Sequence, residues 1–186
     1  MHGWTVAGNY LGVVSMPPVG PMPAVFVRPA TEHDVAFLTD VVLVATRAQG
    51  RLADDFDEAG FRDGFAEWTS EQVRGEVPGS QTSVIEIEGE RAGRLRVVRA
   101  PDHLELAGIQ LLPAHQGHGI GTHLVESFLV EARDAGLPAR VSVEKDNPRA
   151  RALYERLGFA LIGESETDDL LELRPADAGS ARNAAP

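Results

Sequence analysis

The amino-acid sequence predicts one α/β domain, built as a mixed and mostly antiparallel sheet flanked by helices. Several segments alternate apolar and polar residues with a period of two, which is typical of strands with one buried face. Others carry apolar residues three and four positions apart, which is typical of amphipathic helices. The segments follow one another as strand, two helices, three strands, helix, strand, helix and two strands, an order that favours one layered domain. A chain of 186 residues is long enough for one such core.

The folded domain is expected to span residues 24–174. Residues 1–23 end with four prolines between positions 17 and 23, a density that disfavours both helix and central strand. This extension lacks the pattern of a signal peptide, and we expect it to be flexible. Residues 175–186 show no periodic apolar pattern and are predicted to form a disordered tail.

The first strand is expected at residues 25–28, with the first helix directly after it. Thr31 can cap this helix, because Asp34 stands three residues further on and completes a capping box. Apolar residues at helical spacing continue to about Arg47.

A second helix carries aromatic residues along one side. Phe61, Phe65 and Trp68 recur at the spacing of one helix face. Two interpretations fit this stripe: the rings pack in the core, or they form a wall of a substrate pocket.

A hairpin and a bulged strand are predicted next. Residues 83–88 and 91–99 alternate around a turn at Gly89, and residues 103–112 follow as a third strand. In this third strand the apolar parity changes near Ala107 and Gly108. One extra residue there, a β-bulge, restores a single apolar face.

The rest of the chain alternates helices and strands. The expected elements are a helix from Ile120 to Ala132 ended by Gly136, a strand at 137–143, a helix capped by Asn147 with Pro148 at its first position and ended by Gly158, and strands at 159–165 and 170–174.

The turn at residues 111–121, LLPAHQGHGIG, carries the strongest chemical signal. Gly117, Gly119 and Gly121 let the backbone approach a ligand, and the following helix presents free N–H groups and a partial positive charge. A phosphate or pyrophosphate suits such a turn. A plain glycine-rich loop is the alternative. The Rossmann and P-loop patterns are not met, because the glycine spacing and the lysine they require are absent.

Two motifs in this order resemble the GNAT (GCN5-related) N-acetyltransferase superfamily. Gln116, Gly119 and Gly121 fit its Q/R-x-x-G-x-G/A signature. A second segment, VEKDNPRARALYERLGF, resembles its V-x(3)-N-x(2)-A-x(2)-L-Y-x(3)-G-F pattern and supplies Val143, Asn147, Ala150, Leu153, Tyr154, Gly158 and Phe159. The resemblance is densest between residues 83 and 164 and implies the GNAT fold.

The resemblance implies acetyl-CoA as cosubstrate, bound without a metal. The residues expected to bind it are Ile109, Leu111, Gln116, Gly117, His118, Gly119, Ile120, Gly121, Thr122 and Asn147. The strand that contains Ile109 and Leu111 is expected to part from the strand that contains Val143, and the Leu111 N–H is the expected donor to the thioester oxygen. His118 departs from the Lys or Arg of many relatives, which predicts weaker cofactor binding.

Two side chains are candidates for proton transfer. Glu105 matches a catalytic glutamate of some members and is the expected base for the acceptor amine; a solvent-facing role, His103 or a water are the alternatives. Tyr154 matches the family's general acid, which protonates the leaving thiolate. A plain core position is its alternative.

The composition limits the kinds of partner that the chain is expected to bind. The chain has no cysteine and a formal net charge of −11, so we expect a cytoplasmic protein with no nucleic-acid partner and a slight preference for cationic acceptors. No stretch approaches the roughly 20 apolar residues of a membrane span, so no membrane partner is expected. His33, His115 and His123 show no metal-ligand spacing. The acceptor is a small-molecule amine or a protein amino group, and a homodimer is compatible with the resemblance. Two other functions stay open: an acyl-CoA sensor without turnover, and a nucleotide- or NAD-binding domain.

Overall fold

The computed structural model describes residues 23–175. The predictions of a flexible extension at residues 1–23 and a disordered tail at 175–186 therefore lie, except for Pro23 and Pro175, outside the described residues. The elements are β1 (Val25–Pro29), a 3₁₀ turn (Glu32–Asp34), α1 (Val35–Ala48), α2 (Glu58–Val73), β2 (Ser80–Ile87), β3 (Glu90–Arg99), β4 (Leu104–Leu111), a 3₁₀ turn (Pro113–His115), α3 (Ile120–Asp134), β5 (Ala139–Glu144), α4 (Pro148–Arg156), β6 (Ala160–Glu164) and β7 (Asp168–Leu173).

The strands of the described region form a single seven-stranded sheet in the order β1-β2-β3-β4-β5-β7-β6. Every neighbouring pair is antiparallel except β4 and β5, which are parallel. The α3 segment makes the crossover that such a parallel connection requires. The mixed, mostly antiparallel sheet predicted from the sequence is confirmed.

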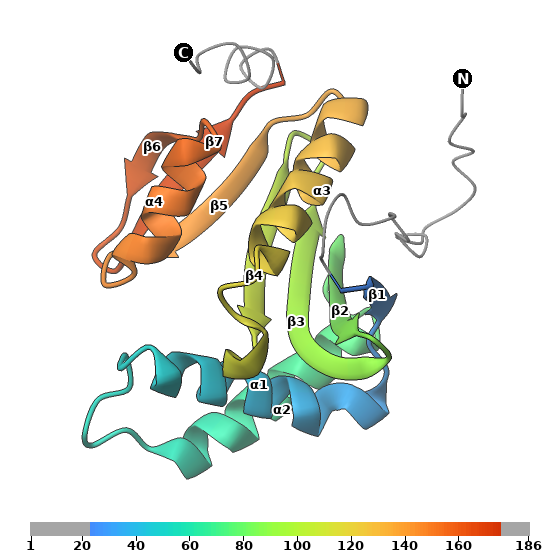
Figure 1. The fold of residues 1–186 in the computed structure, drawn as a ribbon, viewed down its shortest axis with the longest axis vertical. Coiled ribbons are helices and arrows are strands. Elements are labelled where there is room, and N and C mark those ends of the chain that lie inside the picture. The colour runs from blue at the N-terminus through green and yellow to red at the C-terminus, as the bar shows by residue number, and fades with distance from the viewer. Residues whose placement is uncertain (1–22, 176–186) are drawn as a thin grey trace.

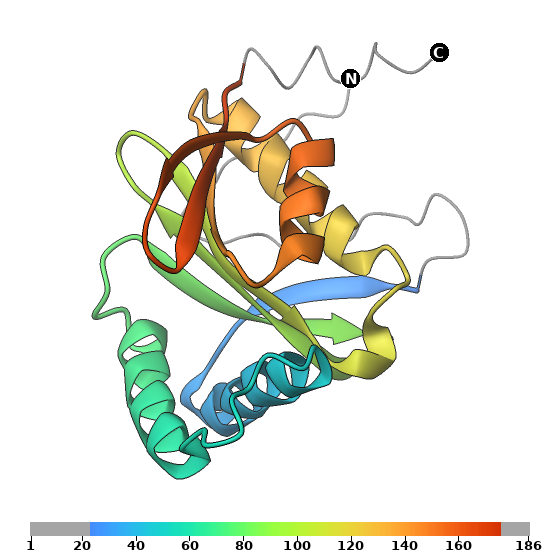
Figure 2. The ribbon, with the colours of Figure 1, turned by 90° about the vertical axis from the view of Figure 1, so that its left-hand side faces the viewer.

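Helices cover both faces of the sheet. In Figure 2, α1 and α2 lie on one side of the strands, and α3 and α4 lie on the other. The α3 side holds the larger apolar core, in which Leu124 and Phe128 join buried strand residues such as Val97 and Leu106. On the other side α1 buries Leu38 completely. Within residues 23–175 no helix has both the length and the apolar character that a membrane crossing needs.

The predicted β-bulge in β4 is confirmed. Arg96 pairs with Gly108, and the next β3 residue, Val97, pairs with Leu106, so Ala107 is the extra residue. The bulge keeps Leu106 and Leu111, which have opposite parity, in the same apolar core.

The strands β4 and β5 separate soon after they meet, as Figure 1 shows. Their register contains only two pairs, Leu104 with Ala139 and Glu105 with Arg140, although β4 continues to Leu111. The sequence-based expectation that these strands part is confirmed. One edge of β4 is therefore open along the half that precedes the glycine-rich turn.

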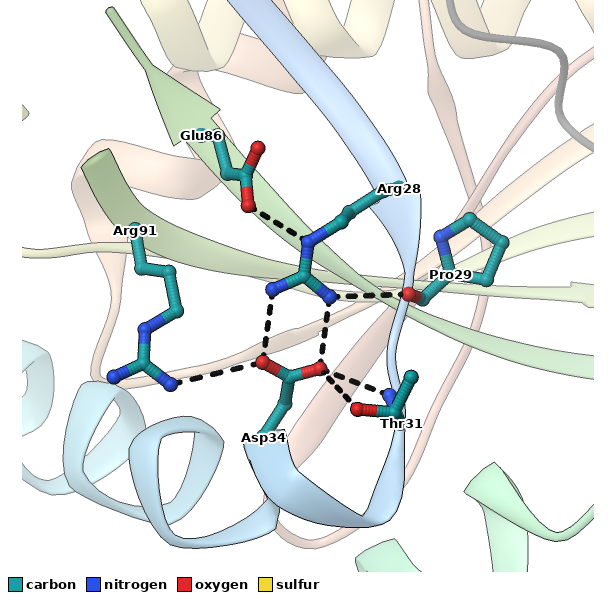
Figure 3. Close-up of polar contacts among 6 residues, drawn as sticks. All are labelled: Arg28, Pro29, Thr31, Asp34, Glu86 and Arg91. Atoms are coloured by element: carbon teal, nitrogen blue, oxygen red, sulfur yellow. Dashed lines mark hydrogen bonds and ion pairs between the residues drawn. The ribbon is translucent and has the colours of Figure 1, made fainter. Parts of the chain in front are cut away.

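An ion-pair network ties the start of α1 to the sheet (Figure 3). The Asp34 side chain accepts hydrogen bonds from the Thr31 backbone N–H at 2.9 Å and from both terminal nitrogens of Arg28 at 2.8 and 2.9 Å. Arg28 also donates to Glu86 at 2.7 Å, and Arg91 lies 3.6 Å from Asp34. The predicted capping box is present, and its carboxylate also joins β1, β2 and β3.

Candidate active site

The glycine-rich turn links the end of β4 to the first turn of α3. Gly117 and Gly119 have φ angles of 80° and 79°, in the left-handed region that glycine tolerates best. Gly119 is also the N-cap of α3. The two glycines let the backbone fold back, so that the first N–H groups of the helix point out of the turn.

A side-chain brace holds this turn against β4. The Gln116 Nε2 donates a hydrogen bond to the backbone carbonyl of Leu111 at 2.8 Å. This bond joins the start of the glycine signature to the last residue of the strand. Gln116 therefore orients the Leu111 peptide group, a role that its position in the motif alone did not indicate.

The first turn of α3 has the geometry of an anion site. The first N–H groups of a helix have no partner within it, and the first intrahelical bond here runs from the His123 N–H to the Gly119 carbonyl at 3.0 Å. A Cβ atom placed at Gly121 meets no heavy atom within 4 Å, so the space above these amides is open. Ile120 is buried in the core, and only its backbone can face a ligand.

The other predicted binding residues of the turn surround this space. His118 is exposed and Thr122 is half-buried in the first turn of α3. A pocket of about 380 Å³ borders the turn and is lined by Pro23, Ile87, Glu88, Glu90, Ala114, His115, His118 and Ile120. Its two carboxylates disfavour a phosphate on that side, which leaves the helix amides as the favourable place for one.

The open edge of β4 presents two backbone donors. The Leu112 N–H donates to Ala92 of β3 at 2.8 Å, and backbone groups alternate in direction along a strand. The N–H groups of Ile109 and Leu111 therefore point away from β3, toward the side that β5 has left. The bulge at Ala107 decides this parity, because before it the Leu104 N–H faces the β5 side and donates to Pro138 at 2.9 Å.

Glu105 lies at the closed end of the opening. It is half-buried and stands opposite Val98 of β3 and beside Arg140 of β5. Its carboxylate interacts electrostatically with Arg96. The alternative base, His103, precedes β4, and its Nδ1 lies 2.9 Å from Asp102 and 3.2 Å from the Arg140 guanidinium.

Tyr154 and Asn147 both have clear structural roles. The Tyr154 ring is 4% exposed and meets Phe159 edge to face, with 5.4 Å between ring centroids. Burial raises the pKa of the Tyr154 phenol to about 12, so the hydroxyl stays protonated at neutral pH. The Asn147 side chain accepts a hydrogen bond from the Ala150 N–H at 3.1 Å, which confirms the predicted N-cap.

The aromatic stripe of α2 does not fill the buried core. Phe61 stacks on Phe65 with 5.1 Å between ring centroids, and Trp68 lies tilted against Phe65 at 5.3 Å. Phe61 and Phe65 are only partly buried, and Trp68 is 37% exposed. The residues that α2 buries are Thr69 and Gln72. The core interpretation is therefore wrong, and the rings lie over the sheet face instead.

Sequence reasoning missed one buried charge on that face. Arg94 of β3 is 3% exposed and lies beneath the Phe65 and Trp68 rings. Arg94 and Arg96 alternate with apolar neighbours in the sequence, but this alternation alone does not show that Arg94 is buried. Within residues 23–175 no three His, Asp or Glu side chains are grouped as metal ligands.

Comparison with known proteins identifies acetyltransferases that are similar to part of this chain. A curated mycothiol acetyltransferase from Nocardia farcinica is 36% identical over 120 residues, which cover 61% of this chain and 39% of that protein. The N-alpha-acetyltransferase RimI of Mycobacterium tuberculosis is 40% identical over 73 residues, covering 39% of this chain and 45% of that protein. The chain thus spans less than half the length of these two relatives.

Solved structures show the same fold at low sequence identity. The PaiA N-acetyltransferase of Thermoplasma acidophilum, solved with coenzyme A, superposes with a TM-score of 0.69 at 16% identity and covers 81% of this chain and 99% of that one. Residues 31–159 also match the model of the acetyltransferase (GNAT) family. That stretch holds the capped first helix, the bulged and parted β4, the glycine turn and the Asn147–Phe159 segment, and the chain belongs to the GNAT acetyltransferase family.

Proposed function

We propose that this chain transfers an acetyl group from acetyl-CoA to a primary amine by direct attack in a ternary complex. The acceptor is a small-molecule amine or a protein amino group. The observation that carries the proposal is the junction of the open β4 edge with the glycine turn. It puts two strand N–H groups that point away from β3 next to a helix N-terminus that can bind a diphosphate.

The parts of coenzyme A fit these two features. The amides at Gly119, Ile120 and Gly121 suit the diphosphate, with Gln116 holding the turn and Gly117, His118 and Thr122 around it. The N–H groups of Ile109 and Leu111 can pair with the extended pantetheine arm and polarise the thioester carbonyl. Asn147 is proposed as a further contact from the far side of the opening, in addition to its role as a cap.

Strand geometry limits how Glu105 can act as the base. At roughly 3.3 Å per residue, Ile109 lies roughly 10–13 Å along β4 from Glu105, and Leu111 roughly 17–20 Å. A carboxylate cannot touch an amine at either position. We therefore propose that Glu105 takes the amine proton through water. We also propose the Ile109 N–H as a second donor to the thioester oxygen beside the Leu111 N–H, because Ile109 is nearer to Glu105.

Tyr154 is proposed to assist the leaving sulfur. With a pKa of about 12 the phenol stays neutral and can donate a hydrogen bond as negative charge develops on the thiolate. An ordinary thiol has a pKa of about 8.5, so full proton transfer from Tyr154 is favourable only where the same apolar surroundings raise the pKa of the thiol. The hydrogen bond in the transition state is the larger contribution of this residue.

The proposal is tested by thiol release from acetyl-CoA against a chemically diverse panel of amines, with calorimetry of acetyl-CoA binding alongside. Thiol release with at least one amine class is the expected result. Acetyl-CoA binding without release on any amine would show a sensor module instead. Thermal stabilisation by NAD or ATP, but not by acetyl-CoA, would show a nucleotide-binding domain.

Tyr154→Phe is expected to lower kcat about tenfold with little change in the acetyl-CoA KM. The variant keeps the ring that packs on Phe159 and loses only the hydroxyl, so the loss is confined to the transition state. Steady-state kinetics measures it, and Phe159→Leu is the control for packing. An unchanged kcat in Tyr154→Phe would remove this residue from the chemistry.

Glu105→Gln is expected to remove the low-pH limb of the kcat/KM profile and to lower the plateau about tenfold. In the wild type the limb reports protonation of the base, and glutamine cannot take up that proton. Profiles of wild type, Glu105→Gln and His103→Gln over pH 5 to 9 measure this. A Glu105→Gln profile that overlays the wild type, with the limb lost in His103→Gln, would assign the base to His103.

A further inference from the structure

Arg94 is a buried cation without an ionic partner in the described part of the chain. It lies in the middle of β3, is 3% exposed, and forms no ion pair with any Asp or Glu among residues 23–175. Two other arginines of the sheet are paired: Arg28 with Asp34, and Arg99 with Glu131 at 2.7 Å. A buried charge without a counter-charge is costly, so its position favours the binding of an anion from beyond the described residues.

The two unpartnered atoms of Arg94 form one edge of the guanidinium. Nη1 donates to the Gln110 Oε1 at 3.1 Å, whereas Nε and Nη2 have no hydrogen-bond partner within residues 23–175. The Nε–H and Nη2–H bonds run side by side, and this fork matches the two oxygens of a carboxylate. Gln110 thus holds the guanidinium by its other nitrogen and leaves the fork free.

The surroundings contact the plane of the guanidinium and leave this buried edge without a hydrogen-bond partner. Its carbon lies 5.4 Å from the Phe65 ring centroid and 5.6 Å from that of Trp68. Stacking on ring faces uses the plane of the cation and makes no hydrogen bond to its edge. Gly108 provides the room, because a Cβ at that position would lie 2.6 Å from Arg94 Nη1.

Other unpartnered polar groups lie under the same helix. Within residues 23–175 the buried side-chain atoms without a partner are Arg94 Nε and Nη2, Thr69 Oγ1 and Gln72 Nε2. Thr69 and Gln72 belong to α2, which covers this face of the sheet. Each of these atoms can donate a hydrogen bond. A cation and further groups that can donate, all on one face of the sheet, are suited to an oxyanion.

The Arg94 guanidinium carries a positive charge at neutral pH. Burial, with a smaller contribution from the nearby charge of Arg96, lowers the pKa of its guanidinium to about 10. The group therefore remains a cation at neutral pH. Arg96 stacks on Trp68 from 4.8 Å, so two positive charges share one aromatic ring in a chain whose net charge is −11.

We propose that Arg94 binds the carboxylate of the acceptor, so that the substrates are amines that also carry a carboxylate group. This inference rests on the proposed acetyl transfer. Gln110, which holds Arg94, lies between Ile109 and Leu111, whose N–H groups face the opening. A carboxylate on the α2 side of β4 thus tethers an amine beside the place proposed for the thioester. The preference overrides the weak attraction for cations expected from net charge.

Binding requires the aromatic cover of Arg94 to move. The α2 helix buries Thr69 and Gln72 near its C-terminal end. Its Phe65 side chain is only partly buried, and Trp68 is 37% exposed. These two rings lie outside the larger core on the other face of the sheet, so they can rotate away from Arg94 without disturbing that core.

Matched pairs of acceptors test the proposal. Glycine, L-lysine and glycylglycine are each compared with their carboxamide in the thiol-release assay. For every pair that is acetylated, the carboxylate member is expected to have at least about a tenfold higher kcat/KM. Arg94→Met is expected to abolish that preference by slowing the carboxylate member at least about tenfold, with the carboxamide changed by less than about twofold.

The control variant is Arg99→Met, which removes an arginine of the same strand that is already paired with Glu131. It is expected to keep the carboxylate preference. Equal rates for carboxylate and carboxamide in the wild type, or equal losses for both in Arg94→Met, would overturn the proposal.

Thermal stability provides a readout that does not depend on turnover. The probes are N-acetylglycine, N-acetyl-L-lysine and N-acetylglycylglycine, each with its amide. The carboxylates are expected to raise the Tm of the wild type but not of Arg94→Met, whose Tm without probe should equal or exceed that of the wild type. If no amine is acetylated, the transferase assignment fails and these shifts still decide the role of Arg94. A Tm that falls in Arg94→Met, or that rises equally with carboxylate and amide, would show a structural arginine.

Discussion

Replacement of Asp34 by asparagine is expected to lower the free energy of unfolding by about 3 kcal/mol at pH 7. The Asp34 carboxylate is 4% exposed and holds Arg28 through two hydrogen bonds, and removing one partner of a buried ion pair costs about 3–5 kcal/mol. The lower end applies because the Arg28 side chain is 35% exposed. The Tm should fall by about 6–12 °C. Urea unfolding of wild type and Asp34→Asn measures the difference.

The effect of this substitution should depend on pH. The hydrogen bonds from Arg28, with a smaller contribution from Thr31, hold the pKa of Asp34 well below its usual range. A carboxyl group whose pKa is lowered in the folded state stabilises the fold at pH values above its pKa in the unfolded state, which is about 3.9. This stabilisation is lost as the pH falls toward the pKa in the folded state. The gap between wild type and Asp34→Asn should therefore be constant from pH 5 to 8 and shrink below about pH 4.

Glu86→Gln is the matched control for the network. Glu86 accepts from the same Arg28 at 2.7 Å but is 24% exposed, so its loss should cost less than about 1 kcal/mol. An Asp34→Asn protein with the urea midpoint of the wild type at pH 7 would contradict the account of Asp34 as an anchor between α1 and the sheet.

Replacement of Gly121 by valine is expected to weaken coenzyme A binding at least about a hundredfold, or about 2.8 kcal/mol. The valine side chain enters the open space above the first amides of α3, where the diphosphate is proposed to bind. The fold itself should be unaffected, because the φ angle of Gly121 is outside the left-handed region and valine is a better helix residue than glycine. Calorimetry with coenzyme A and a thermal melt measure the two effects.

Two controls separate a blocked site from a general loss of structure. Gly121→Ala adds a single methyl group and should change coenzyme A affinity by less than about fivefold. Gly64→Val makes the same substitution in α2, at a glycine whose added Cβ also meets nothing within 4 Å, and should leave affinity unchanged. Wild-type affinity in Gly121→Val would place the diphosphate elsewhere.

Local patterns predicted much of the fold correctly. The parity change between Leu106 and Ile109 was sufficient to predict the bulge, because side chains alternate along a strand and an extra residue is needed to keep both on one face. The capping box at Thr31 and Asp34, and the cap at Asn147, were predicted because each depends on atoms three residues apart.

Long-range contacts decided the features that local patterns could not show. Phe61, Phe65 and Trp68 have the spacing of a core stripe, yet Phe65 and Trp68 lie over Arg94, which belongs to β3. Nothing near Arg94 in the sequence shows that α2 covers it. The partners of Asp34 could not be predicted for the same reason. They are Arg28 of β1 and Arg91 of β3, and neither strand is part of the turn that carries Asp34.

The sequence by itself determined the family, the order of helices and strands, the bulge, and a glycine turn suited to a diphosphate. All of these depend on interactions within a few residues or on motifs that are contiguous in the chain. Only the tertiary structure decided that β4 and β5 part after two pairs, that Ile109 and Leu111 face the opening, and that Arg94 is buried with a free edge. The physical reason is that burial and pairing are set by which distant segments meet, and a single strand or helix does not contain that information.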